Sequence, residues 1–450
     1  MNCCQNSHKN AHIPTKLGAM TRANSKLKTF SWMLWDWAEQ PYPTIMQTFI
    51  FPVYLASAVA TAAQNPDQAI GWATAVAGVV LALIAPVLGR RSDENGRRKF
   101  WLVINTYMLV AIMIASFFVE PKPEFFLFGL VLYAIGSVVQ ESAFINYYAM
   151  LKGVTKESNI GKISGFAWAL GYVGGIILLM VSLIAFVLPE NPVIPTDGSL
   201  NIRAIFVFCA IWTLIFSIPL LLFVPEIPKK ATAQKESIAA SYGKLWGQLK
   251  TLRAQAPETL KFLISSAIYR DGLAGVFTFG AVLGTLAFGF DQSSIIFYGV
   301  AANIVAGIGA AIGGVLDDRI GSRAVIVGSL VGLIISGSCV FIFSYMGQIA
   351  YWIFGLTLSL FVGPAQASSR TFVSRFTPTG REGEVFGLYQ FTGRAVSFLS
   401  GTFWSLSIAT AVAIGVSGNT TVYGIWGIVL ILTVGLFLLL RVHPNPKVID

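Results

Sequence analysis

A charged motif occurs twice in this chain, first as Gly89-Arg90-Arg91-Ser92-Asp93-Glu94-Asn95-Gly96-Arg97-Arg98-Lys99 and again, 225 positions later, as Gly314-Val315-Leu316-Asp317-Asp318-Arg319-Ile320-Gly321-Ser322-Arg323. Both copies follow the pattern G-x-x-x-D-x-x-G-x-R, and each lies between two long apolar runs. Self-similarity at half the chain length indicates two related halves. Two membrane-embedded halves of this kind are typical of a transporter that rocks around a central site.

The composition requires an apolar solvent. Of the 450 residues, 55% are hydrophobic and 12% are charged, whereas a soluble domain is usually about 25% charged. The net charge of +10 comes from short basic clusters between hydrophobic runs. That pattern marks membrane topology and membrane lipid as the surroundings, and it does not form a nucleic-acid-binding face.

Twelve stretches are long and apolar enough to cross a bilayer as helices, since a span needs about 20 such residues. In the first half they are 32–60, 68–89, 99–119, 124–149, 160–188 and 201–224, and in the second half 259–289, 293–317, 324–345, 348–372, 383–413 and 420–441. We therefore expect an all-α integral membrane protein with two pseudo-symmetric six-helix bundles. The predicted divisions are an N-tail (1–30), an N-terminal bundle (31–224), a linker (225–258), a C-terminal bundle (259–441) and a C-tail (442–450).

Basic residues predict the orientation of the spans. Lys122 and Arg203 are the only ones in the loops on one side, and Arg270 and Arg394 fall within spans. The remainder lie in the tails, in the opposite loops or at the span ends next to them, which places both termini in the cytoplasm by the positive-inside rule. In the linker, apolar residues recur at helical spacing among lysines, which predicts an amphipathic helix on the inner membrane face. Such a helix either tethers the halves or regulates them.

Each copy of the motif joins two apolar runs on the side predicted to be cytoplasmic. Gly89 and Gly314 lack a Cβ and allow close helix approach, and the later glycines permit a turn. A carboxylate at a helix end accepts hydrogen bonds from arginine or from a neighbouring helix N-terminus. We interpret the two loops as a gate whose contacts form in one conformation and break in another; the alternative is that they only fix topology. The predicted gate residues are Gly89, Asp93, Gly96, Arg97, Arg98, Gly314, Asp318, Arg319, Gly321, Arg323 and, on span ten, Arg370.

The repeated pattern resembles the cytoplasmic signature of the major facilitator superfamily. Glu94 departs from it, because that family usually has a basic residue there, and we expect a weaker gate in the first half. Further segments resemble the UMF1 branch, which includes yeast vacuolar amino-acid effluxers linked to autophagy. These segments are Trp35–Ala38 with Thr48–Tyr54, Ser164–Gly175, Tyr269–Gly272, Gln366–Pro378 and Glu384–Tyr389.

The resemblance covers most of the chain and implies a solute transporter, with amino acids as one candidate class of substrate. The match departs at Glu39-Gln40-Pro41, where the family usually carries small or amide residues. A carboxylate at Glu39 is therefore a candidate for a change of substrate or of coupling ion.

Ionisable groups inside a bilayer cost several kcal/mol unless they are paired or hydrated, so each is a candidate site. Arg270, Asp271 and Arg394 lie near the middle of spans seven and eleven. We expect one arginine to neutralise Asp271 and the other to meet an anionic group of the substrate. The alternative is a structural ion pair that holds helices together.

Asp36 and Glu39 are three residues apart and share a helix face near the inner end of span one. Two neighbouring carboxylates raise each other's proton affinity, which suits proton coupling; the alternative is that both are hydrated at the entrance or capped by loop arginines. Glu141 and Asn146 lie on span four, where only one is expected to face a cavity.

On span ten, Gln366 and Arg370 face one way, and Arg370 is placed near the cytoplasmic end in a gating or snorkelling role. Trp168 and Tyr389 lie deep enough to line a solute cavity, although helix packing is the alternative for each. The candidate solute- or ion-binding residues are Asp271, Arg394, Arg270, Glu141, Asn146, Asp36, Glu39, Gln366, Trp168 and Tyr389.

No enzyme signature is present: the chain has no phosphate-cradling G-x-x-x-x-G-K-[ST] loop, and its three histidines lie in the tails. We expect no metal and no cofactor. The sequence favours a monomeric secondary transporter of a small solute, coupled to an ion, most simply H+, in a bacterial cytoplasmic (inner) membrane. A membrane sensor or receptor on a transporter fold is the alternative, and a passive channel is disfavoured by the paired gate.

Overall fold

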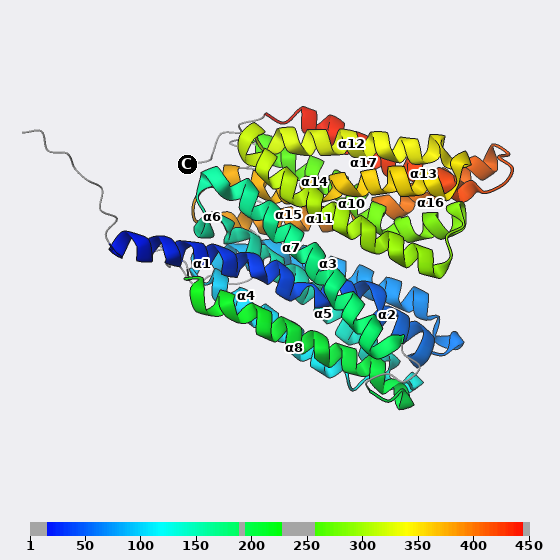
Figure 1. The fold of residues 1–450 in the computed structure, drawn as a ribbon, viewed down its shortest axis with the longest axis horizontal. Coiled ribbons are helices and arrows are strands. Elements are labelled where there is room, and N and C mark those ends of the chain that lie inside the picture. Colours follow the sequence, from blue (N-terminus) through cyan, green and yellow to red (C-terminus); the bar gives the residue numbers. More distant parts are fainter. Residues whose placement is uncertain (1–15, 189–193, 227–256, 444–450) are drawn as a thin grey trace, which may run out of the picture.

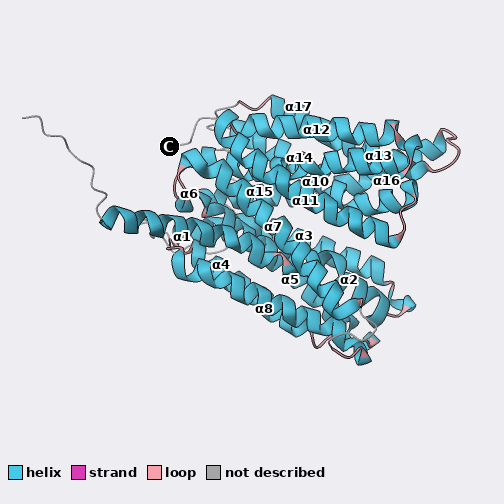
Figure 2. Cartoon of the chain, in the orientation of Figure 1, coloured by secondary structure: helices cyan, strands magenta, loops and turns pink. Residues whose placement is uncertain are grey.

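The computed structural model describes residues 16–188, 194–226 and 257–443, and these residues form helices and connecting turns (Figure 2). In the first half the α-helices are α1 (Lys16–Glu39), α2 (Phe51–Tyr54), α3 (Pro66–Glu94), α4 (Arg98–Ser116), α5 (Phe126–Ala149), α6 (Leu151–Val154), α7 (Ile160–Ser182) and α8 (Leu200–Phe223). Short 3-10 helices (Ala62–Gln64, Pro123–Phe125, Glu157–Asn159 and Asp197–Ser199) and π-helices (Pro41–Phe49, Leu55–Val59 and Leu183–Val187) extend or connect them.

The second half repeats this arrangement. Its α-helices are α10 (Pro257–Phe288), α11 (Gln292–Ile320), α12 (Ser322–Ile342), α13 (Gln348–Ala350), α14 (Leu356–Phe376), α15 (Glu382–Ala395), α16 (Leu399–Ala413) and α17 (Gly424–Leu440). The connecting segments are 3-10 helices at Ser344–Met346 and Thr420–Tyr423 and a π-helix at Tyr351–Gly355.

Eleven helices in the described part of the chain are long and apolar enough to cross a membrane. The predicted first span, 32–60, is helical along its length but divided into α1, a π-helix, α2 and a second π-helix. Pro41, Pro43 and Pro52 account for the division, since proline removes a backbone donor and crowds the preceding turn. Helix α1 also begins at Lys16, inside the stretch predicted to be the N-tail.

The two halves lie side by side as helical bundles, the first coloured blue to green and the second light green to red (Figure 1). Between them α3 packs against α15 and α7 against α11. We call the end of the molecule that holds the C-termini of α3 and α11 and the N-termini of α7 and α15 the motif end. Both copies of the repeated motif lie there.

Parts of three predicted segments lie outside the described residues. These parts are 1–15 of the N-tail, 227–256 of the linker, which include the predicted amphipathic helix, and 444–450 of the C-tail.

Candidate functional site

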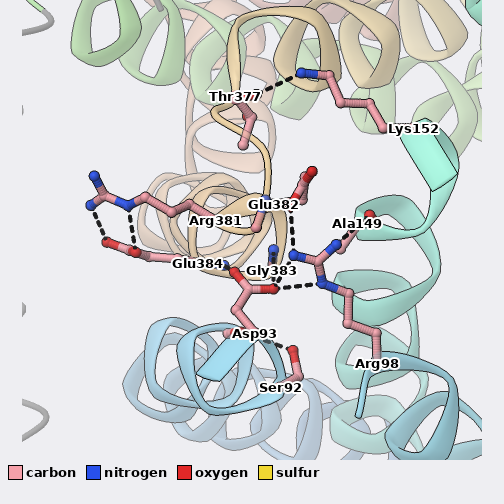
Figure 3. A network of polar contacts seen from close by, with 12 residues as sticks. Ser92, Asp93, Arg98, Ala149, Lys152, Thr377, Arg381, Glu382, Gly383 and Glu384 are labelled. Atoms are coloured by element: carbon pink, nitrogen blue, oxygen red, sulfur yellow. Dashed lines mark hydrogen bonds and ion pairs between the residues drawn. The ribbon is translucent and has the colours of Figure 1, made fainter. Parts of the chain in front are cut away.

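The first copy of the motif connects α3 to the opposite half of the protein (Figure 3). The Asp93 carboxylate accepts hydrogen bonds from the backbone N–H groups of Gly383 at 3.0 Å and Glu384 at 2.9 Å, in the first turn of α15. Arg98 pairs with Asp93 and with Glu382, each at 2.5 Å. A helix N-terminus carries partial positive charge and unpaired N–H groups, so a carboxylate is well placed there.

A second contact beside this one also joins the halves. The Lys152 ammonium group, on α6, donates to the backbone carbonyl of Thr377 at 2.6 Å. Burial lowers the pKa of Lys152. On the α15 side, Arg381 pairs with Glu384 at 3.0 Å, and this hydrogen bond raises the pKa of Arg381.

The second copy of the motif repeats the construction with the halves exchanged. Asp318, on α11, accepts from the backbone N–H groups of Gly161 and Lys162 in the first turn of α7, both at 2.8 Å. Arg375 of α14 pairs with Asp318 at 2.9 Å and with the buried Asp317 at 2.5 Å. Both motif carboxylates therefore hold a helix of the other half.

The motif glycines lie where these helices touch. A Cβ added to Gly89 would stand 1.9 Å from the carbonyl oxygen of Gly383, and one added to Gly314 would stand 2.6 Å from that of Gly161. Carbon and oxygen atoms that are not bonded do not approach this closely, so the observed packing requires glycine at both positions. Gly96 and Gly321 turn the chain with positive φ angles of 59° and 88°.

Arg370 of α14 crosses between the halves deeper in the molecule. Its side chain is 1% exposed and pairs with Asp36 of α1 at 3.3 Å. It also donates to the hydroxyl group of Ser164 at 2.9 Å and to the backbone carbonyl of the same residue at 2.8 Å. The snorkelling alternative is therefore wrong, because the guanidinium group is enclosed by protein.

A network in the middle of the spans, which we call the central network, also joins the halves. Glu141 of α5 forms an ion pair with Arg394 of α15 and accepts a hydrogen bond from Gln390 at 2.6 Å. Arg270 donates to the Gln390 side chain at 2.8 Å, and its guanidinium group lies 3.7 Å from the centre of the Tyr389 ring. The side chains of Arg394 and Glu141 are 29% and 19% exposed, so this pair is only partly enclosed by protein.

Among the described residues Asp271 forms no ion pair with an arginine, so that expectation is wrong. Its carboxylate accepts hydrogen bonds from the backbone N–H group of Ser400 at 2.6 Å and from the Ser400 hydroxyl group at 3.3 Å. Ser400 lies in the first turn of α16, where the chain resumes a helix after the break that follows α15. Asp271 therefore caps α16.

Asp36 and Glu39 are both only 3% exposed, so their hydration at an entrance is excluded. Asp36 accepts from the Tyr147 hydroxyl group at 2.9 Å in addition to its pairing with Arg370. Glu39 accepts from the side-chain amides of Gln40 and Gln140. The Gln140 carbonyl oxygen has no hydrogen-bond partner within the described residues.

The chain is similar to known proteins in sequence and in fold. Residues 152–447 match the family model described as vacuole effluxer Atg22 like. The chain belongs to the Atg22-like family. It is 25% identical over 417 residues to the uncharacterized MFS-type transporter YxiO of Bacillus subtilis, covering 91% of this chain and 93% of that protein. It is 24% identical over 257 residues to Autophagy-related protein 22 of Kluyveromyces lactis, covering 53% and 50%.

Solved structures place this Atg22-like protein in the major facilitator fold. The proton:xylose symporter XylE matches with a TM-score of 0.70 and 12% identity, covering 94% of this chain and 96% of that one. The transporter FucP in its outward conformation matches with a TM-score of 0.66 and 14% identity, covering 94% and 99%. The predicted family and fold class are confirmed, and the chain is a multi-pass membrane transporter.

Several predicted residues lie apart from the contacts between halves. Arg97 and Arg319 are exposed, with Arg97 over the Phe100 ring, and Arg323 donates to the Leu440 carbonyl within its own half. Asn146 is buried and donates to Ser142 of its own helix. The structure places these four side chains outside the gate contacts and the central network.

Three other residues bear on those contacts. Gln366 accepts a hydrogen bond from Tyr172 of the other half at 3.0 Å, and Trp168 lies beside Arg370. Glu94 pairs with Arg90 on its own helix at 2.7 Å. It does not displace Asp93 from its hydrogen bonds to Gly383 and Glu384.

Sequence reasoning missed the partners of the motif carboxylates. Glu382, Gly383, Asp317 and Arg375 all take part in the contacts at the motif end. One signal was available in the sequence. The segment Gly380-Arg381-Glu382-Gly383-Glu384 is charged and contains glycine, and it lies at the start of span eleven. Gly161 lies at the corresponding place in the other half, at the start of span five.

Proposed function

We propose that this Atg22-like transporter moves a small solute by alternating access, with the paired helix caps of Asp93 and Asp318 as the gate at the motif end. One observation supports this best: each half contributes one carboxylate and one helix N-terminus to the contact. Hydrogen bonds to a charged group contribute about 1.5–3 kcal/mol each. Four such bonds form the two caps, beside the Arg98–Glu382 ion pair and the Lys152–Thr377 hydrogen bond, and opening of the motif end breaks all of them.

The solute site is the central network. Glu141 and Arg394 neutralise each other across the halves, and removing one partner of such a pair leaves an uncompensated charge within the membrane. A solute that carries both a positive and a negative group replaces both partners at once. This supports amino acids or related zwitterionic metabolites as the substrate class. The effluxer description of the matching family supports export as the direction.

Proton coupling is assigned to Asp36, Glu39 and Glu141. Asp36 and Glu141 each pair with an arginine from the other half, whereas Glu39, among the described residues, accepts hydrogen bonds from two side-chain amides. A buried carboxyl group without a paired cation is the kind of group that takes up a proton. Glu39 is therefore the proposed proton carrier, one helical turn from the Asp36–Arg370 pair.

The positive-inside rule supports an orientation with the motif end in the cytoplasm. We assign the protein to a bacterial cytoplasmic membrane, with both termini inside and the monomer as the working unit.

Two experiments test the proposal. The first measures uptake of a panel of amino acids into proteoliposomes with and without a pH gradient, with the Arg394→Ala variant as the inactive control. The expected result is saturable uptake that changes with the pH gradient. Uptake at the same rate with and without the pH gradient excludes proton coupling. Binding of an amino acid without its uptake favours the sensor alternative.

The second is a closure assay for the motif end. Pyrene labels are attached at Lys162→Cys and Arg319→Cys after Cys3, Cys4, Cys209 and Cys339 are replaced by serine. The hydrogen bond from the Lys162 backbone N–H to the Asp318 carboxylate brings these positions together, so excimer emission reports closure. A substrate that leaves excimer emission unchanged contradicts alternating access.

A further inference from the structure

The Arg370 guanidinium group lies inside a cage of four aromatic rings. Its central carbon is 5.0 Å from the ring centre of Trp168, 5.1 Å from Tyr148, 5.2 Å from Trp32 and 5.6 Å from Tyr147. All four rings belong to the first half of the protein, on α1, α5 and α7. We call them the aromatic cage. Each distance is within the range of about 6 Å over which an aromatic face attracts a cation.

Contacts within the first half hold the aromatic cage together. The Trp32 and Tyr147 rings stack with centres 4.3 Å apart, and the Trp32 indole N–H donates to the Tyr147 backbone carbonyl at 3.2 Å. The Tyr147 hydroxyl group donates to Asp36 at 2.9 Å. Phe144 stacks on Tyr148 at 5.3 Å. Because none of these contacts involves Arg370, the cage and its carboxylate form a preorganised site that belongs to one half.

Arg370 is supplied by the other half, on α14. When the halves separate at the motif end, as the proposed function requires, Arg370 leaves with its own bundle. The first half then keeps four aromatic faces and the Asp36 carboxylate but loses the cation that neutralised them. Aromatic faces around a carboxylate are the construction that recognises alkylammonium groups.

We propose that the aromatic cage with Asp36 binds the alkylammonium group of a ligand that enters from the motif end once Arg370 has withdrawn. Arg370 is then a built-in competitor, which occupies the cage in the closed state and excludes the ligand. The Tyr148 and Glu141 positions on α5 are seven residues apart, which corresponds to about 10 Å along a helix. When the ammonium group of a ligand is held in the cage, the other end of that ligand can therefore reach the central network.

The test compares choline with 3,3-dimethylbutan-1-ol, which has the same shape without the charge. Binding of each compound to purified protein in lipid nanodiscs is measured by isothermal titration calorimetry, which does not depend on the tryptophans that the variants remove. The Arg370→Ala variant empties the cage and is expected to bind choline at least tenfold more tightly than the natural protein. Because population of the competent state sets apparent affinity, the Asp93→Asn/Asp318→Asn variant is expected to fall between them. The alcohol is expected to bind none of the three measurably.

Controls separate the cage from other effects. Adding Trp168→Leu or Asp36→Asn to the Arg370→Ala variant is expected to abolish its gain in choline affinity. Equal binding of choline and the alcohol, or a gain that survives both additional changes, overturns the proposal. If Arg370→Ala does not fold, the Asp93→Asn/Asp318→Asn variant is measured with and without Trp168→Leu. Its gain in choline affinity should then be lost when Trp168→Leu is added, and a gain that survives overturns the proposal.

This proposal and the proposed function fail in different ways. Tight choline binding by Arg370→Ala with no change of excimer emission in any gate variant supports the cage and contradicts alternating access. Normal opening without choline selectivity contradicts the cage alone.

Discussion

Asp93 and Asp318 occupy the same position in the two copies of the motif, and each carboxylate accepts hydrogen bonds from the second and third residues of a helix in the opposite half. For Asp93 these residues are Gly383 and Glu384 of α15, and for Asp318 they are Gly161 and Lys162 of α7. The internal duplication of the chain thus appears in the structure as two equivalent helix caps across one interface.

Replacing these carboxylates is expected to open the motif end. Asn retains the size of Asp but accepts fewer hydrogen bonds and carries no charge. Since charged hydrogen bonds are roughly twice as strong as neutral ones, Asp93→Asn and Asp318→Asn should each weaken closure by about 1–2 kcal/mol. The expected result is a loss of excimer emission in the closure assay, larger in the double variant.

The matched control is Asp67→Asn, because Asp67 is an exposed carboxylate at the opposite end of α3. It should leave excimer emission unchanged. Undiminished emission in the Asp93→Asn/Asp318→Asn variant would contradict the gate.

Adding a methyl group at Gly89 is expected to prevent closure altogether. The new Cβ would lie 1.9 Å from the Gly383 carbonyl oxygen, so α3 and α15 must separate. Gly89→Ala should therefore lose excimer emission and transport while the protein remains folded. Gly78→Ala on the same helix is the control, since its Cβ would have no neighbour within 4 Å. Full transport by Gly89→Ala would show that the close contact is not used in the cycle.

The fold could be predicted because both of its signals are local. Long apolar runs define spans, and the repeated motif defines two halves. The division of the first span is less visible, since Pro41, Pro43 and Pro52 lie in a run that is still apolar enough for a helix. In a membrane, neighbouring helices satisfy the backbone groups that proline frees, so proline alone does not reveal where such a span is divided.

The partners of the site residues could not be predicted, because they are set by packing between halves. Arg394 and Asp271 have opposite charges and lie near the middle of spans eleven and seven, so the sequence alone favours pairing them. In the structure Glu141, which is 253 positions from Arg394, takes that place, and Asp271 caps a helix instead. Sequence separation carries no information on such contacts unless the relative placement of the bundles is known.

Neutralising the central ion pair separates structure from transport. Arg394→Gln or Glu141→Gln alone leaves an unpaired charge, and each is expected to lower thermal stability and to reduce uptake at least tenfold. The double variant Glu141→Gln/Arg394→Gln should regain stability, because no charge is left uncompensated, but should not regain uptake. Melting curves and proteoliposome uptake measure the two effects. Recovery of uptake in the double variant would mean that the pair only holds helices together.

Asp271 is expected to matter for stability more than for solute affinity. Its hydrogen bonds to Ser400 cap α16, and loss of a cap costs about 0.5–2 kcal/mol. Asp271→Ala should therefore lower the melting temperature, whereas Asp271→Asn should lower it less because asparagine is also a good cap. The KM for solute should be unchanged in both. A raised KM at unchanged stability would instead make Asp271 part of the solute site.

Because of Lys152, closure of the motif end is expected to become more favourable as pH rises in the alkaline range. Burial lowers its pKa in the closed state from the ordinary value of 10.5, and exposure to water in the open state restores that value. The closed state therefore binds fewer protons in the interval between the two pKa values, and it gains stability relative to the open state as pH rises through that interval. Excimer emission should therefore increase as pH rises toward the ordinary lysine pKa of 10.5. Lys152→Gln keeps a donor for the Thr377 carbonyl but cannot titrate, so it should abolish the increase. An unchanged pH profile in this variant would assign the effect to another group.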